Sequence, residues 1–188
     1  MRLISDRNIL DEVCLKFCNI LEKHCKYIVV SGFVAISAGR SRGTEDIDVI
    51  IERISSETFT KMHRDLEKAG FECIQGADPL ELYNLYLRDN LPIRYTLAGY
   101  PLPEMEVKPA KDFLDEIQIQ NRIKIPLTGL DVWFSSIETN IAFKEELLKS
   151  DKDLEDSRHL RKVFKDEINE TNIVKLKELI KKYRLKAK

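Results

Sequence analysis

The chain has 188 residues, of which 43% are hydrophobic and 34% charged, and its formal net charge is −1 at pH 7. This length suffices for about one domain with its own core, and the balanced charge argues against attraction to nucleic acid by charge alone. No apolar stretch reaches the roughly 18 residues of a membrane-spanning helix, and the acidic N-terminal residues do not form a signal peptide. We therefore expect no membrane partner and a cytoplasmic location.

The first predicted elements are a helix, a strand and a tight turn. Ser5 or Asp6 can cap an amphipathic first helix, and the apolar run over residues 27–30 predicts a strand. The run meets Ser31 and Gly32 and continues with residues that suit a short helix. A glycine there lets the backbone approach a ligand closely, and the free N–H groups of the helix would form an anion site.

A pair of acidic residues, Asp46 and Asp48, begins the next predicted strand. Residues i and i+2 of a strand point to the same face, so the two carboxylates stand side by side. Such a pair suits Mg²⁺, which also keeps positions open for nucleotide phosphates. The loop over residues 39–45 carries Arg40 and Arg42, whose guanidinium groups could bind phosphate oxygens. An acidic pair also occurs on surfaces without function, so the neighbouring strand and turn carry the interpretation.

The rest of the pattern predicts further helices and strands before a helical C-terminal part. In chain order these are a helix over residues 55–69 closed by Gly70, a strand over 71–74, a helix over 78–87, strands over 93–97, 105–107, 117–125 and 130–134, and helices from 136 to the end. The strand over 117–125 is predicted because isoleucines alternate with polar residues. We predict an α/β (α+β) fold with a core over 1–134 and a helical subdomain over 135–188.

The stretch over residues 27–52 resembles the nucleotide-binding core of the nucleotidyltransferase superfamily that includes DNA polymerase β, especially its small prokaryotic branch. The resemblance implies a mixed sheet flanked by helices, with a strand, a glycine turn, a helix, an Arg-x-Thr loop ending at Thr44, and the acidic strand. Ser31 and Gly32 stand where the family carries Gly-Ser or Gly-Gly, so the first glycine is replaced.

The resemblance also implies a third carboxylate on an adjacent strand. Glu106 matches this position, which the family usually fills with aspartate, and Glu104 is the nearest competitor. Glu106 would ligate the metal ion or act as a base for the attacking hydroxyl group. The alternative is an exposed strand residue in an acidic patch.

A second zone of resemblance lies in the helical C-terminal part. Lys144, followed by Lys152, Asp153 and Asp156, is similar to the Lys and Lys-Asp-x-x-Asp pattern of abortive-infection toxins and related bacterial and archaeal nucleotidyltransferases. The resemblance implies that these residues contact the nucleotide or position its neighbours. Asp153 and Asp156 are spaced to share one helix face. The alternative is a charged solvent face, or carboxylates favoured by the helix dipole.

Together the two zones imply a Mg²⁺- or Mn²⁺-dependent enzyme that transfers a nucleotidyl group from a nucleoside triphosphate. Asp46, Asp48 and Glu106 would be its catalytic metal ligands. The acceptor would be a hydroxyl group of a protein, a tRNA or a small molecule, and the resemblance to toxins favours the first two. Two other classes stay open: a catalytically weak nucleotide-binding regulator, and an antitoxin-like interaction protein. The oligomeric state is left open.

The four cysteines of the chain invite a metal-site interpretation. Cys14 and Cys18 are one helical turn apart on the first predicted helix, close to His24. Their spacing is not that of a known zinc motif. We therefore predict that the thiols pack in a reduced core.

Overall fold

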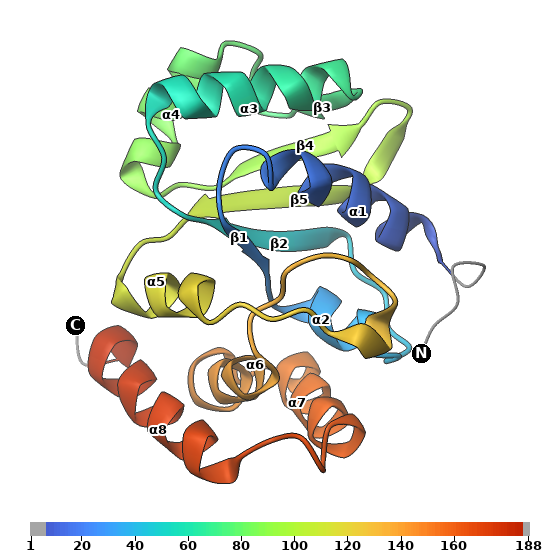
Figure 1. Cartoon of the computed structure of the whole chain (residues 1–188), viewed down its shortest axis with the longest axis vertical. Coiled ribbons are helices and arrows are strands. Elements are labelled where there is room, and N and C mark those ends of the chain that lie inside the picture. The colour runs from blue at the N-terminus through green and yellow to red at the C-terminus, as the bar shows by residue number, and fades with distance from the viewer. Residues whose placement is uncertain (1–6, 186–188) are drawn as a thin grey trace.

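A computed structural model describes residues 7–185 and contains a five-stranded mixed sheet flanked by helices (Figure 1). The strands are β1 (Tyr27–Val29), β2 (Asp46–Ile51), β3 (Phe71–Cys73), β4 (Ile93–Leu97) and β5 (Tyr100–Pro109). Their order across the sheet is β1-β2-β5-β4-β3. Neighbouring strands are antiparallel except β2 and β5, which run parallel. This parallel pair brings two distant acidic segments together at the centre of the sheet.

The helices form groups at opposite ends of the molecule, with α3 and α4 at one end and α6 to α8 at the other (Figure 1). The α-helices are α1 (Ile9–Leu21), α2 (Gly32–Ser37), α3 (Ser56–Lys68), α4 (Pro79–Leu85), α5 (Phe113–Gln120), α6 (Ile137–Phe143), α7 (Asp151–Val163) and α8 (Glu170–Ile180). Short 3₁₀ turns are η2 (Leu87–Asp89) and η3 (Pro126–Thr128), and π-helical turns are η4 (Lys144–Leu148) and η5 (Lys181–Leu185). No helix within residues 7–185 is both long enough and apolar enough to span a membrane.

Helix α1 begins after Asn8, which forms a reciprocal cap with Asp11. The Asn8 side chain accepts a hydrogen bond from the Asp11 N–H at 3.1 Å, and the Asp11 carboxylate accepts one from the Asn8 N–H at 3.0 Å. This arrangement satisfies two N–H groups that the helix itself leaves unpaired. The predicted caps Ser5 and Asp6 lie outside the described residues.

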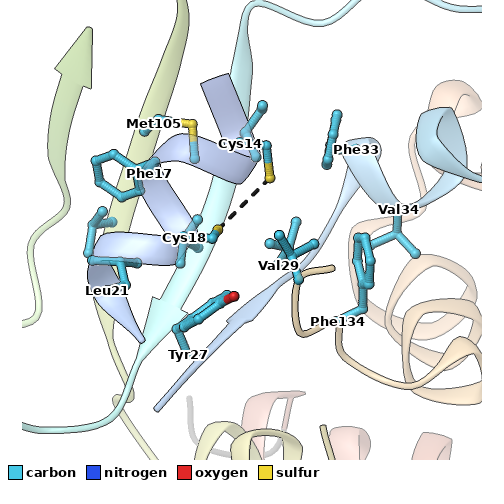
Figure 2. Packing of buried hydrophobic residues seen from close by; sticks show 14 of the residues in the cluster. Cys14, Phe17, Cys18, Leu21, Tyr27, Val29, Phe33, Val34, Met105 and Phe134 are labelled. Carbon is cyan, nitrogen blue, oxygen red and sulfur yellow. Dashed lines mark hydrogen bonds between the residues drawn. The ribbon is translucent and has the colours of Figure 1, made fainter. Parts of the chain in front are cut away.

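The core lies between the sheet and the helices that pack on it, and Figure 2 shows part of it. Phe17 of α1 and Tyr27 of β1 are fully buried there. Complete burial of such a side chain contributes about 1.5–3 kcal/mol relative to exposure. Cys14 and Cys18 are buried free thiols whose sulfur atoms lie 3.9 Å apart. The prediction of core thiols is confirmed for this pair.

The two faces of β2 have different surroundings. Ile47 and Val49 are fully buried in the main core. Asp46, Asp48 and Ile50 share the opposite face, where α5 covers only part of the sheet. The acidic end of β2 is therefore left accessible, while its apolar face anchors the strand.

The predicted strand over 117–125 is wrong, because residues 117–120 belong to α5 and, of the rest, Ile123 alone pairs as a strand residue would, in an isolated bridge to Phe134. The Asp112 carboxylate accepts hydrogen bonds from the N–H groups of Leu114 at 3.0 Å and Asp115 at 3.2 Å, and so begins a helix. The buried side chains of α5 recur at helical spacing: Leu114, Asp115, Gln118 and Ile119. Alternating isoleucines fit a strand locally, but the cap and the packing favour the helix.

The predicted strand over 130–134 is also wrong. Phe134 alone pairs as a strand residue would, in isolated bridges to Val29 and Ile123. The N–H of Val29 donates a hydrogen bond to the Trp133 carbonyl at 2.8 Å. Because β1 ends at residue 29, it offers too short an edge for a further ladder.

The predicted helical C-terminal part is present and begins where the Ser136 hydroxyl accepts a hydrogen bond from the Thr139 N–H. Leu160 of α7 and Ile173 of α8 belong to the same buried cluster as Val13 of α1. The hydrophobic core is thus continuous between the sheet and the C-terminal helices. The division into a core over 1–134 and a subdomain over 135–188 stays a prediction.

Candidate active site

Four carboxylates gather on the accessible face of β2 and β5. The parallel register sets Asp46 beside Glu104 and Asp48 beside Glu106. Alternate residues of a strand share a face, so all four side chains lie opposite the buried Ile47. Asp46 is exposed, Asp48 is half-buried, and Glu106 is only 6% exposed. The structure thus places the three carboxylates that the sequence singled out on one face of the sheet.

Thr44 holds Asp46 at the start of β2. Its hydroxyl lies 3.0 Å from both the backbone carbonyl oxygen and the Oδ1 atom of Asp46. A hydroxyl shared between these acceptors restricts the Asp46 side chain to one orientation. Thr44 therefore contacts the acidic strand itself.

Two cations pair with the carboxylates. The Nζ atom of Lys108 lies 3.1 Å from Oδ1 of Asp48 and 2.5 Å from Oε1 of Glu106. The Nη2 atom of Arg94 lies 2.7 Å from Oε2 of Glu106, and its Nε atom lies 3.4 Å from Oε2 of Glu104. Glu106 is thus held from two sides, whereas Glu104 has one longer contact.

These contacts shift the pKa values of the central groups. Burial raises the pKa of Asp48, and the nearby Lys108 only partly opposes it. Burial acts in the same direction on Glu106, but hydrogen bonds from Lys108 and Arg94 outweigh it and leave the Glu106 pKa below its usual range. Burial would lower the pKa of Lys108, yet its contacts with Glu106 and Asp48 raise it. Lys108 and Glu106 therefore form a charged pair at neutral pH.

The donor chemistry fits the divalent cation that the resemblance implies, because Mg²⁺ prefers carboxylate oxygens. Asp46, Asp48 and Glu106 would be the ligands. Within residues 7–185, however, no group of three or more His, Cys, Asp or Glu side chains is gathered closely enough to hold a metal ion. The Lys108 ammonium bridges Asp48 and Glu106 instead. Asp48 and Glu106, which both reach this one ammonium, fit the ion in donor type once the ammonium moves aside, and nucleotide phosphates would supply further oxygen ligands.

A cavity of about 490 Å³ opens beside Asp48 and Lys108. Its apolar wall includes Phe143 and Leu147, and Arg184 of η5 forms part of another side. Pockets for small ligands have volumes of about 300–1,000 Å³ and mainly apolar walls with a few polar groups. The C-terminal helical part therefore completes a ligand-sized cavity over the acidic face of the sheet.

Asp156 of α7 is a fully buried carboxylate that contacts three cations. Its Oδ2 atom lies 2.8 Å from Nη1 of Arg42 and 2.8 Å from Nζ of Lys144. Its Oδ1 atom accepts a hydrogen bond from Arg40. Lys144 is itself only 1% exposed. One carboxylate thus joins the 39–45 loop to α7 and to the end of α6.

The other predicted C-terminal site residues surround this cluster. Nζ of Lys144 lies 3.1 Å from Oδ1 of Asp153. Arg40 also pairs with the exposed Glu155, and it donates a hydrogen bond to the backbone carbonyl of Lys152 at 3.0 Å. Lys152 itself is an exposed residue. The structure thus gathers the predicted residues into an ion-pair network, from which the Lys152 side chain stands apart.

Ser31 and Gly32 form a tight turn against this network. Ser31 has a φ of 66°, a conformation that non-glycine residues adopt at a cost of order 1 kcal/mol or more. A Cβ atom on Gly32 would lie 2.6 Å from Nη2 of Arg42. Ser31, which replaces the first glycine of the family pattern, therefore has the positive φ that favours glycine. Gly32, the glycine that is kept, lets the Arg42 side chain lie against the backbone.

Gly32→Ala is expected to weaken nucleotide binding by about tenfold, or 1.4 kcal/mol, and to lower the free energy of unfolding by less than the loss of Asp156 does, because Arg40 and Lys144 keep their contacts with that carboxylate. The added methyl group would push the end of the Arg42 side chain, which is flexible enough to move, away from the turn and from Asp156. Gly43→Ala is the matched control, because a Cβ there meets nothing within 4 Å. Equal nucleotide affinities of the two variants in calorimetry would remove the turn from the site.

Asp156→Asn is expected to lower the free energy of unfolding by about 3–5 kcal/mol, the usual cost of breaking a buried ion pair. The change removes the negative charge that three cations share. Urea unfolding would measure it, with Glu155→Gln as the control, because the Glu155 side chain is 58% exposed. Glu155→Gln should lower the free energy of unfolding by no more than about 1 kcal/mol. Equal losses in the two variants would show that burial of the carboxylate does not determine its contribution to stability.

Sequence reasoning missed Lys108, Arg94 and Arg184 as residues around the site. Lys108 could have been found, because it is two residues beyond Glu106 and so shares its face of β5. Arg94 lies opposite Glu106 on the antiparallel strand β4, a pairing without a local sequence signal. Arg184 reaches the cavity from the C-terminal turn η5, far along the chain from the acidic strand and without a local sequence signal.

Comparisons with known proteins identify the fold. No family model matches the chain, and no curated protein sequence is significantly similar to it. Among solved structures, the antibiotic-resistance factor ANT(2'')-Ia is 12% identical with a TM-score of 0.51, over 92% of this chain and 93% of that one. An antigenic nucleotidyltransferase-like protein from Paracoccidioides brasiliensis is 14% identical with a TM-score of 0.50, over 92% and 88%. The chain therefore has the nucleotidyltransferase-type fold, and the predicted fold class is confirmed.

Proposed function

We propose that the protein is a nucleotidyltransferase that moves a nucleoside monophosphate group from a nucleoside triphosphate to a hydroxyl group. The observation that carries this proposal is the parallel register of β2 and β5, which sets Asp48 beside Glu106 on the same face as Asp46. The nucleotidyltransferase-type fold supports the same reaction. A cavity large enough for a nucleoside adjoins Asp48.

In the proposed reaction the acceptor oxygen bonds to the α-phosphorus, and the bond from that phosphorus to the oxygen bridging the β-phosphate breaks. Pyrophosphate leaves with the electron pair, and the hydroxyl proton passes to a carboxylate. Asp48 and Glu106 lie side by side on the face where this proton would be released, and either carboxylate could accept it. A bound Mg²⁺ or Mn²⁺ would neutralise charge on the phosphates and the leaving group.

We place the nucleoside in the 490 Å³ cavity and its triphosphate toward Asp46 and Asp48. Lys108 lines this cavity and is exposed enough to turn toward an anionic ligand, whereas Lys144 and Arg184 in its wall are held by carboxylates. The phenyl ring of Phe143, also in the wall, offers a base an apolar surface. The predicted phosphate contacts of Arg40 and Arg42 belong to the same proposal, and Asp156 would hold both guanidinium groups near the turn.

The acceptor is proposed to approach beside Asp46, next to the phosphate contacts of Arg40 and Arg42. There the 40–46 segment, Lys152 and Glu155 line a more open hollow of about 840 Å³. An open hollow admits a hydroxyl group carried by a large molecule, so a protein or tRNA acceptor is favoured over a small alcohol. The similar antibiotic-resistance factor keeps a small-molecule acceptor as the alternative to test.

A nucleotide-binding regulator without turnover is the second candidate. It is favoured by Lys108, whose ammonium bridges Asp48 and Glu106 where a catalytic ion would bind. A regulator would bind a nucleoside triphosphate and leave it intact. The two candidates therefore share the cavity and differ only in the fate of the α-phosphate.

The decisive experiment incubates the protein with each α-labelled nucleoside triphosphate, Mg²⁺ or Mn²⁺, and a cell extract. Transfer is expected to label one macromolecule, with release of an equal amount of pyrophosphate. Separate RNase and protease digestions identify the acceptor as tRNA or protein, and label in the small-molecule fraction identifies a small alcohol. Saturable nucleotide binding with no release of pyrophosphate would support the regulator instead.

A further inference from the structure

Lys108 is a cation placed between two of the carboxylates that would hold a metal ion. Its Nζ atom lies 2.5 Å from Glu106 and 3.1 Å from Asp48. An ammonium and a divalent ion that both bridge these oxygens exclude each other, since the gap is small and both are positive. In the free protein, the Lys108 ammonium therefore pairs with both carboxylates without a metal ion.

The surroundings allow Lys108 to leave this position. Its side chain is 41% exposed and also lines the 490 Å³ cavity. Lysine has a long flexible stem, so its ammonium can turn from the carboxylates toward a ligand in that cavity. Arg94 differs, because it approaches Glu106 from the opposite oxygen and can stay in place.

A nucleoside triphosphate would supply what draws the ammonium away. Its phosphates offer several negative oxygens, and they also bind the divalent ion directly. Metal binding displaces the Lys108 ammonium from the carboxylates, and nucleotide binding draws it away from them. Each binding event therefore favours the other, and the coupling is reciprocal. Metal and nucleotide would then bind more tightly together than either binds alone.

We propose that Lys108 competes with the divalent cation for Asp48 and Glu106, so that the ion binds weakly to the free protein and tightly only together with a nucleoside triphosphate. The clause about the nucleotide rests on the proposed function, whereas the competition itself concerns only the free protein. Lys108 would thereby prevent an unloaded site from keeping its metal.

The test measures Mn²⁺ affinity of the full chain by electron paramagnetic resonance, without nucleotide and with a non-hydrolysable α,β-methylene triphosphate. Without nucleotide, Lys108→Met is expected to bind Mn²⁺ about tenfold more tightly than wild type, or more, as the removal of a unit charge near the ion predicts. The gain on adding the analogue should be large for wild type and small for Lys108→Met.

Two further variants make the result specific. Lys108→Arg keeps the charge and can bind both carboxylates, so its Mn²⁺ affinity without nucleotide should equal that of wild type or be weaker. Lys111→Met removes a nearby cation that also lines the cavity but forms no ion pair with a described residue, so its affinity should stay within about threefold of wild type. If Lys108→Met misfolds without metal, Lys108→Arg still decides, because tighter Mn²⁺ binding by that variant overturns the proposal.

Equal or weaker Mn²⁺ binding by Lys108→Met than by wild type would overturn the competition. An equal gain in Mn²⁺ affinity for Lys108→Met and Lys111→Met would also overturn it, because any nearby positive charge would then have the same effect. Failure of the proposed function looks different: Lys108→Met gains metal affinity, yet wild type releases no pyrophosphate from any triphosphate. If wild type turns over and Lys108→Met gains no Mn²⁺ affinity, the competition by Lys108 is contradicted and the proposed enzyme activity stands.

Discussion

Replacing Asp46 and Asp48 by asparagine is expected to abolish nucleotidyl transfer in a chain that remains folded. Metal-bound carboxylates supply several kcal/mol of transition-state stabilisation, so the rate should fall by about 10³-fold or more. The fold should survive, because Ile47 and Val49 anchor β2 and neither is changed. Lys108 also keeps Glu106 as a partner when Asp48 loses its charge.

Pyrophosphate release measures the rate of this double variant, and urea unfolding measures its stability. Glu45→Gln is the matched control, since it removes an exposed carboxylate from the residue just before β2. Because Glu45 also lines the hollow proposed for the acceptor, a second control is Glu57→Gln on α3, whose side chain is 78% exposed and lines neither cavity. Glu57→Gln should retain wild-type turnover, and an unchanged rate in the double variant would show that the paired carboxylates are not the active site.

Glu106→Gln is expected to lower kcat by a factor on the order of 10²–10³ with a modest change in KM, the pattern of a contact that matters mainly in the transition state. Glu104→Gln should do little. Both residues share the acidic face, but Glu106 lies beside Asp48, is 6% exposed, and is held by Lys108 and Arg94. The Glu104 side chain is 30% exposed and has one contact at 3.4 Å.

Steady-state kinetics of the two glutamine variants, at saturating metal, separate these roles. Glutamine has nearly the shape of glutamate, so neither change creates a cavity. A large loss of kcat in Glu104→Gln, with near-normal turnover in Glu106→Gln, would move the third carboxylate to position 104. Equal and small losses in both would favour the regulator.

Local sequence signals predicted the elements that carry the site. The apolar alternation of β2 and the turn at Gly32 are local, and the pairing of Asp48 with Glu106 agrees with the family resemblance. The strand predicted over 117–125 was wrong because its alternating isoleucines favour a strand locally, although the segment begins in a helix. The cap at Asp112 and the packing of α5 decided between them, and packing is not a local property.

The surroundings of the site were harder to predict than its carboxylates. Arg94 reaches Glu106 through an antiparallel pairing, and Arg42 reaches Asp156 across 114 positions of the chain. Such contacts depend on which strands and helices become neighbours. Sequence patterns placed Arg42 and Asp156 near a nucleotide, whereas the structure adds that they bind each other.

Asp156 also restricts how the sequence can change. Arg40, Arg42 and Lys144 come from two separate segments of the chain, and all three place a positive charge on this one buried carboxylate. Loss of the acid would leave Arg42 without a carboxylate partner among the described residues and the buried Lys144 with Asp153 alone, and loss of the cations would leave a buried anion. Substitutions at these four positions are therefore tolerated mainly in combination, so a lineage that abandons one of them should be found to have altered the others as well.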